Sequence, residues 1–312
     1  MSQARVAVPS SLLSEPGLAH SDASQGDWTA HRLTELFELI PIGLELKQIL
    51  STRPPGSCPL DPAQTIKLFD NRMTTPLGEP LQRWTEIWLD SDQARDLDGI
   101  LLPTGTLSAP SHQSGSGEVQ SGSAPAATDR FAATVMKRLP LLPIEAMDRI
   151  QDPELRELFV TRVLAKARLR NLFESKWTWS QLIDFHSREK TLLLAHCPAT
   201  LKVLGALVAK GPASCKEVAD NYPILFMEAL QVPSSRGKHA NALNHLAGFF
   251  KRRVSDEGRR SVAQIIESYR LGRITRKVPL NLIRRIGTEH HCAWLLKQSY
   301  LYLSPNSEAL EL

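Results

Sequence analysis

The chain has 312 residues, of which 42% are hydrophobic and 22% are charged, and this balance excludes a wholly disordered protein. No stretch approaches the roughly 18 consecutive apolar residues of a membrane span, and no basic segment precedes an apolar run at the N-terminus, so we expect a cytoplasmic protein without membrane contacts. The four cysteines are scattered and form no CxxC pair, which favours reduced thiols over a metal knuckle or a disulfide framework.

The net charge of +4 hides an asymmetry between the two halves of the chain. Residues 1–155 carry 12 Lys and Arg against 20 Asp and Glu, whereas residues 156–312 carry 25 against 13. Six of the nine histidines also lie in the second half. A basic half predicts an anionic partner, with nucleic acid as one candidate; attraction between the two halves is the alternative.

The N-terminal half alternates strand and helix patterns. β-branched and apolar runs typical of buried strands lie at 5–13, 40–46, 97–103 and 140–145. Apolar residues at helical spacing lie at 28–40, 81–89 and 130–139. This alternation predicts an α/β domain with a doubly wound, mostly parallel sheet, which we place at residues 1–153.

Residues 104–128 differ from the rest of this half because they are built from Ser, Gly, Pro and Ala, with hardly any bulky apolar residue. Such a segment cannot offset the entropy lost on ordering. The composition therefore predicts a flexible, low-complexity loop inside the first domain.

The period becomes helical from Asp152 onward. Asp152 suits an N-cap and Pro153 the first position of a helix. Further helix patterns lie at 179–195, 198–209, 214–231, 236–254, 255–272, 279–287 and 292–301. We therefore expect residues 154–312 to form an all-α helical bundle.

Several motifs of the C-terminal half resemble the bacterial YbgA-type domain. They cover most of residues 180–305 and include FHSREK at 185–190, LFMEAL at 225–230, RGKHANALNHL at 236–246 and VPL at 278–280. The resemblance implies a helical domain, and it implies little mechanism because the function of that family is largely uncharacterised.

The N-terminal half resembles the thiouracil desulfidase (TudS-like) family, whose domain is often fused in front of the YbgA-type domain. The resemblance rests on LPIE at 142–145, TRPP at 52–55, DGI at 98–100 and the junction at 152–163. It implies an α/β fold that holds a 4Fe–4S cluster on three cysteines, with one iron open to take the sulfur of a thiolated base.

The matching cysteine positions hold other residues in this chain. Ser11 stands at the first position, in PSSLLS; Gly43 at the second, in PIGLE; and Ala109 at the third, in TLSAP. A cluster needs thiolate ligands, and Cys58 is the sole thiol of this half, so we expect no iron–sulfur cluster and no other cofactor. Glu45 matches the family's acid/base carboxylate and is the one candidate catalytic residue of a degenerate active site.

The predicted helix that starts at Arg236 concentrates groups able to hold an anion, namely Arg236, Lys238, His239, Asn241 and His245. Lys238 and His245 lie seven residues apart and share a helix face, with Asn241 between them. A helix N-terminus also favours an anion. The pattern predicts a pocket for phosphate or another small anion; polar helix packing with buried histidines is the alternative.

His186 and Lys190 lie one turn apart on an earlier predicted helix and could contribute to the same pocket. A zinc site there would need a third ligand from elsewhere, so we assign no metal. Basic runs at 251–253, 259–260, 273–277 and 284–285 favour contact with a phosphate backbone, with a plain solvated face as the alternative.

These observations predict that the basic helical domain binds a nucleotide, RNA or another anionic ligand in nucleobase or nucleic-acid metabolism. One alternative is an enzyme, a desulfidase or hydrolase of modified nucleobases, with its site at His186, Arg236, His239 and His245. The other is a protein-interaction scaffold whose basic half docks an acidic protein.

Overall fold

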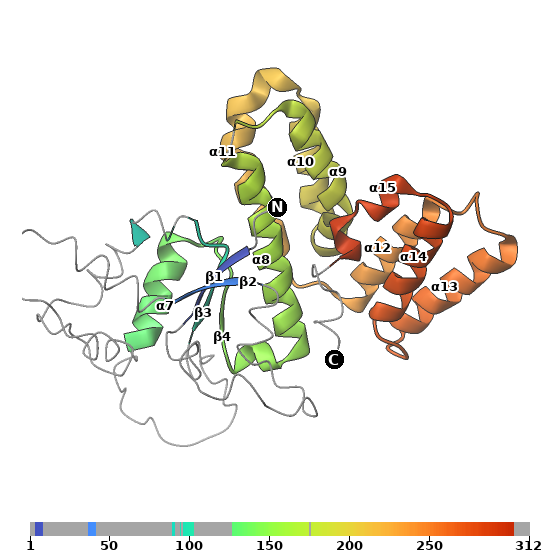
Figure 1. Ribbon diagram of the computed structural model, residues 1–312, viewed down its shortest axis with the longest axis horizontal. Helices are drawn as coiled ribbons and strands as arrows, with labels where there is room; N and C mark the ends of the chain where they lie inside the picture. Colours follow the sequence, from blue (N-terminus) through green and yellow to red (C-terminus); the bar gives the residue numbers. More distant parts are fainter. Residues whose placement is uncertain are drawn as a thin grey trace, which may run out of the picture. The chain divides into compact units, whose positions relative to one another are not determined.

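The computed structural model of the chain describes residues 4–8, 37–41, 89–90, 94, 96–102, 127–174 and 176–302 (Figure 1). It divides into two units, one of residues 1–167 with 308–312 and one of residues 168–307. The boundary expected after residue 153 lies at the start of a long helix, α8 (Pro153–Phe173), and the division between the two compact units lies inside that helix. The expected loop at 104–128 lies outside the described residues, apart from 127–128, which begin a helix.

The described residues of the first unit include four parallel strands: β1 (Ala4–Val8), β2 (Phe37–Pro41), β3 (Gly99–Leu102) and β4 (Ile144–Ala146). Their order in the sheet is β2-β1-β3-β4, so consecutive neighbours require crossover connections. The parallel sheet that the sequence predicts for the first domain is confirmed.

The helix expected over 28–40 is wrong at its end, because 37–40 belong to β2. Phe37 pairs with Ala4 and Ile40 pairs with Ala7 of β1. Apolar residues over so short a run satisfy helical and strand spacing alike, and pairing with a buried neighbouring strand decides between them.

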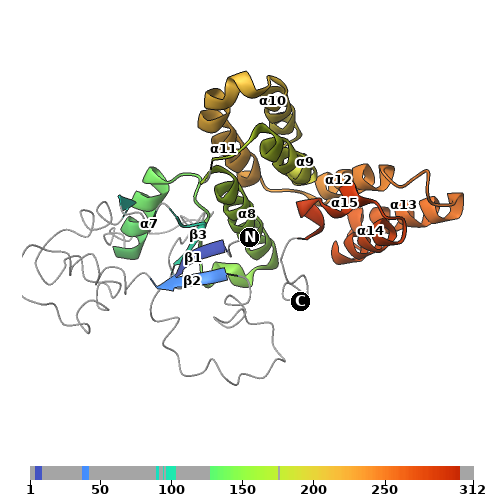
Figure 2. The same cartoon turned by 45° about the horizontal axis from the view of Figure 1, so that its top comes forward.

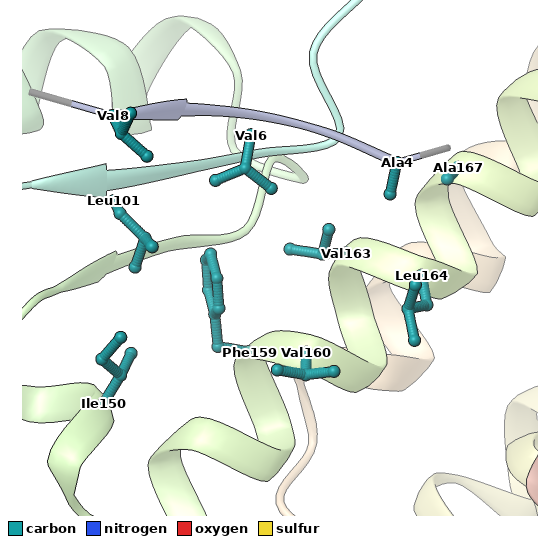
Figure 3. Close-up of a cluster of buried hydrophobic side chains, with 10 residues drawn as sticks. All are labelled: Ala4, Val6, Val8, Leu101, Ile150, Phe159, Val160, Val163, Leu164 and Ala167. Carbon is teal, nitrogen blue, oxygen red and sulfur yellow. The ribbon is translucent and has the colours of Figure 1, made fainter. Parts of the chain in front are cut away.

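Helices α7 (Ala127–Arg138) and α8 lie on opposite faces of the sheet (Figures 1 and 2). Alternate side chains of β1 lie on the two faces. Val6 and Val8 belong to the core beneath α8 (Figure 3). Ala7 belongs to the core beneath α7. A Cβ at Gly99 would lie 2.6 Å from Val163 Cγ2 of α8, so glycine permits the close approach of helix and strand.

The second unit is helical, as the sequence predicts. After the last turn of α8 come α9 (Trp179–His196), α10 (Pro198–Ala209), α11 (Cys215–Gln231), α12 (Arg236–Gly248), α13 (Asp256–Arg270), α14 (Lys277–Glu289) and α15 (Ala293–Leu296). Short 3-10 turns complete it at η2 (Pro212–Ser214) and η3 (Ser299–Leu301), while η1 (Arg149–Gln151) precedes α8. Helix α9 packs against α10, α11 and α12, and α12 also packs against α13 and α14 (Figure 2).

Two helices are shorter than the sequence pattern predicts. Helix α12 ends at Gly248 and not at 254, because a turn follows and Ser255 caps the next helix. The pattern at 292–301 splits into α15 and η3 around Gln298, whose backbone is extended. The buried Gln298 side-chain amide forms hydrogen bonds with the Thr191 hydroxyl and the Ser187 carbonyl of α9. These tertiary contacts override local helix propensity.

Candidate functional site

The N-terminus of α12 is fixed by two local interactions. Ser235 Oγ accepts a hydrogen bond of 3.3 Å from the Lys238 backbone N–H, which caps the helix. The Lys238 ammonium donates to the carbonyls of His196 at 3.1 Å and Pro233 at 3.3 Å. Lys238 therefore ties the end of α9 to the segment before α12, while Arg236 remains exposed at the helix start.

His239 is buried and lies between Arg276, which directly precedes α14, and Tyr300 of η3. Its Nε2 is 2.7 Å from Arg276 Nη1, and its Nδ1 is 2.9 Å from the Tyr300 hydroxyl. Arg276 Nη1 also lies 3.0 Å from Nδ1. Because a guanidinium can only donate, the unprotonated ring nitrogen of a neutral His239 accepts from Arg276. Burial, reinforced by the charge of Arg276, lowers the pKa of His239 to about 2, so the ring is neutral.

His196 completes this group from α9. Its ring lies edge-on to His239, with centroids 6.3 Å apart, and its Nδ1 is 2.9 Å from the Val232 carbonyl. We call His196, Lys238, His239, Arg276 and Tyr300 the His239 cluster. Polar contacts among these residues connect α9, α12, the start of α14 and η3.

The remaining predicted residues do not join the His239 cluster. Asn241 and His245 are exposed on α12. His186 Nδ1 lies 3.0 Å from the Tyr222 hydroxyl of α11, and Lys190 is exposed on α9. Burial, followed by the charge of Lys190, lowers the pKa of His186 to about 4. The residues expected to form one anion pocket are therefore in different places. His239 is buried on α12, Asn241 and His245 are exposed on α12, and His186 and Lys190 lie on α9.

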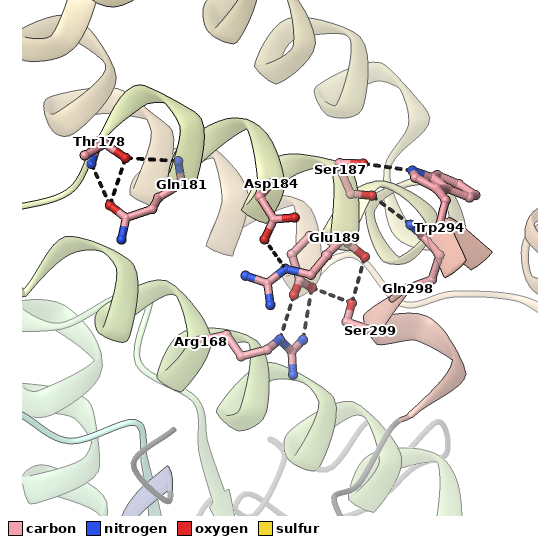
Figure 4. Close-up of polar contacts among 10 residues, drawn as sticks. Arg168, Thr178, Gln181, Asp184, Ser187, Glu189, Trp294, Gln298 and Ser299 are labelled. Carbon is pink, nitrogen blue, oxygen red and sulfur yellow. Dashed lines mark hydrogen bonds and ion pairs between the residues drawn. The ribbon is translucent and has the colours of Figure 1, made fainter. Parts of the chain in front are cut away.

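A second polar network, which the sequence analysis did not predict, connects α9 with α8 and with residues 294–299 (Figure 4). Glu189 is 1% exposed and receives two bonds from Arg168, at 2.6 and 3.0 Å, and one from Ser299 Oγ at 2.7 Å. Beside it, Thr191 donates to Gln298 at 2.7 Å. Glu189 lies within the FHSREK motif, but no sequence signal showed that it is buried or that its partners are far along the chain.

Positive charge is concentrated on α12–α15. Residues 232–302 hold fourteen Lys and Arg against four Asp and Glu, a net charge of +10, whereas residues 168–231 hold eight against six. Three of the four acids pair with arginines one turn away, as Asp256–Arg259, Glu267–Arg270 and Glu289–Arg285. The acids therefore do little to offset the remaining cations of this surface, which favours an anionic partner.

Three further expectations concern a metal site, a membrane-spanning helix and the candidate residues of the first unit. Among the described residues, no group of three or more His, Cys, Asp or Glu side chains is placed to hold a metal ion. In the same part of the chain, no helix combines the length and apolar character required to cross a bilayer. Ser11, Gly43, Glu45, Cys58 and Ala109 all lie outside the described residues.

Comparisons with known proteins concern the helical unit. Residues 190–305 match the family described as "Protein of unknown function (DUF1722)". The chain is 31% identical over 146 residues to "Uncharacterized protein YbgA" of Escherichia coli (strain K12), an alignment that covers 46% of this chain and 86% of that protein. No solved structure matches the chain.

Proposed function

Since this chain belongs to the YbgA family, we propose that its helical unit binds a nucleotide-like or RNA-derived anionic ligand through the basic surface of α12–α15. The observation that carries the proposal is the net charge of +10 over residues 232–302. Cations gathered on one set of packed helices attract phosphates and release the counterions that surround a nucleic acid.

The exposed cations supply the proposed contacts. Many of them lie in or beside the turns that join the helices, where long side chains can reach a ligand: Arg236, Lys251, Arg252, Arg259, Arg260, Arg273 and Lys277. Asn241 and His245 add donors on the exposed face of α12. In this proposal the His239 cluster fixes α12 against α14, and it is this fixed arrangement that presents the surface.

Removing two exposed cations from this surface should weaken binding and reduce its salt dependence. We expect the double variant Arg252→Gln, Arg260→Gln to bind a fluorescein-labelled RNA several-fold more weakly at about 50 mM salt, because two phosphate contacts are lost. The slope of log affinity against log salt should become shallower by up to about 2. Fluorescence anisotropy at several salt concentrations measures both quantities.

The matched control removes two exposed cations from the nearly neutral part of the same unit. Lys202→Gln, Lys216→Gln changes the net charge by the same amount and should leave affinity and slope close to those of the unchanged protein. Equal effects of the two double variants would indicate a nonspecific charge effect. Absence of binding to nucleotide, RNA and DNA at low salt would favour the protein-interaction scaffold.

For the first unit we propose a doubly wound domain of desulfidase type that no longer holds a cluster. Strands β2, β1 and β3 are parallel neighbours, so their carboxyl ends meet at one edge, where ligands of such sheets bind. Ser11, Gly43 and Ala109 each follow the end of one of these strands in sequence. A hydroxyl, a hydrogen and a methyl group do not fit the thiolate requirement of an iron–sulfur cluster.

Protein purified without oxygen should therefore be colourless. Iron and acid-labile sulfide should be far below the about four of each per chain that a 4Fe–4S cluster requires. Colorimetric iron and sulfide assays, together with the visible absorption spectrum, measure this. A brown protein with stoichiometric iron and sulfide would contradict the proposal and would point to ligands other than the three matched positions.

A further inference from the structure

Three aromatic rings, one stacked pair and one edge-on neighbour, are in contact on α12 and α15. Phe249, at the end of α12, stacks on Trp294 of α15 with ring centroids 4.0 Å apart and planes 30° apart. His245, one turn earlier on α12, meets Phe249 edge-on at 5.5 Å. Phe249 nevertheless remains 48% exposed, so a large part of its ring faces solvent.

The two segments that carry this stack are held in place. The Trp294 indole N–H donates to Ser187 Oγ of α9 at 2.9 Å, and this hydrogen bond fixes the Trp294 ring. Arg253, four residues after Phe249, donates to the His290 carbonyl at 2.7 Å and to Cys292 Sγ at 3.2 Å. The turn after α12 and the turn before α15 are thus tied together, and Phe249 is pre-organised at the surface.

The surroundings of the stack are basic. Lys251 and Arg252 lie two and three residues after Phe249 and are exposed, and Lys297 is exposed one turn after Trp294. The sequence has no Asp or Glu between 245 and 255 or between 290 and 302. An exposed aromatic side chain whose flanking segments carry cations and no acid is complementary to a planar base attached to phosphates.

We propose that Phe249 is a stacking platform for an unpaired base of a single-stranded nucleic acid, with Lys251 and Arg252 on the flanking phosphates. This inference rests on the proposed function and specifies the form of the ligand. A base inside a duplex has both faces covered by its neighbours, so only an unpaired base can cover Phe249. Base–aromatic stacking tolerates any sequence, because every base offers a planar face.

The test compares single-stranded and double-stranded probes of equal length by fluorescence anisotropy. We expect Phe249→Ala to weaken binding of a labelled single-stranded oligonucleotide by about 10- to 100-fold, the range for loss of one stacked base. Binding of the duplex should change by less than about twofold. Phe249→Tyr, which retains a planar ring, should restore affinity for the single strand.

Two controls separate stacking from general effects. Leu271 is also 48% exposed, but it has no planar ring, so Leu271→Ala should not change binding of either probe. Stacking releases no counterions, so Phe249→Ala should keep the salt slope of the unchanged protein, whereas Arg252→Gln should reduce it. RNA and DNA single strands of one sequence show whether the 2′-hydroxyl contributes.

Several outcomes would overturn this inference. Equal loss of single-strand and duplex binding in Phe249→Ala would indicate a structural role for the ring. Unchanged single-strand binding would leave the basic surface as the whole site, so the proposed function would stand while the inference fails. Binding of neither probe by the unchanged protein at low salt would remove both, and an apolar side chain of a partner protein would then be the better occupant.

Discussion

Replacing Glu189 with alanine is expected to lower the free energy of unfolding by about 3–5 kcal/mol, the range for breaking one partner out of a buried ion pair. Glu189 is 1% exposed, and both of its carboxylate oxygens receive bonds from Arg168, which is itself 24% exposed. The variant removes the carboxylate that pairs with Arg168 and that accepts a hydrogen bond from Ser299 Oγ. The C-terminal part of α8 and the turn η3 would each lose one link to α9.

Urea unfolding followed by circular dichroism measures this loss, and an exposed ion pair on the same helix provides the control. Asp184 lies 3.1 Å from Arg188 at i,i+4 and is 52% exposed, so Asp184→Ala should cost less than about 1 kcal/mol. The double variant Arg168→Met, Glu189→Leu removes both charges and should recover most of the stability. Similar costs for Glu189→Ala and Asp184→Ala would show that the buried network is not formed.

The helix starts could be predicted from sequence because their causes are local. Asp152 accepts bonds from the backbone N–H groups of the first turn of α8, and Pro153 occupies the first position of that helix, as the dipeptide predicts. Ser235 caps α12 in the same way. The end of α12 and the break at Gln298 could not be predicted, because a following turn and contacts with α9 determine them.

The candidate site was only partly predictable for a related reason. Helical spacing correctly places Lys238 and His239 on one helix, but it does not reveal which side chains are buried. Arg276 and Tyr300 contact His239 from positions 37 and 61 residues away. The sequence placed Arg276 in a basic run and treated it as surface charge, whereas it is 9% exposed. Only tertiary packing brings these groups together.

Acidification should destabilise the folded protein through its buried histidines. Burial lowers the pKa of His239 to about 2 and that of His186 to about 4, compared with about 6.5 in an unfolded chain. The stability from these neutral rings is fully present above pH 6.5. It is lost as the pH falls from 6.5 towards each folded pKa, because the unfolded chain then binds protons that the folded chain does not. The loss approaches about 1.4 kcal/mol per pH unit for each histidine.

We therefore expect the two histidines to lower the free energy of unfolding by about 5 kcal/mol between pH 7 and pH 4.5, as measured by urea denaturation at a series of pH values. His239→Gln removes one titrating group and should reduce the slope in this range by about 1.4 kcal/mol per pH unit. Tyr300→Phe removes a hydrogen-bond partner of His239 while keeping the ring, so it should lower stability by a similar amount at every pH. A slope in His239→Gln equal to that of the unchanged protein would show that His239 is not held neutral in the fold.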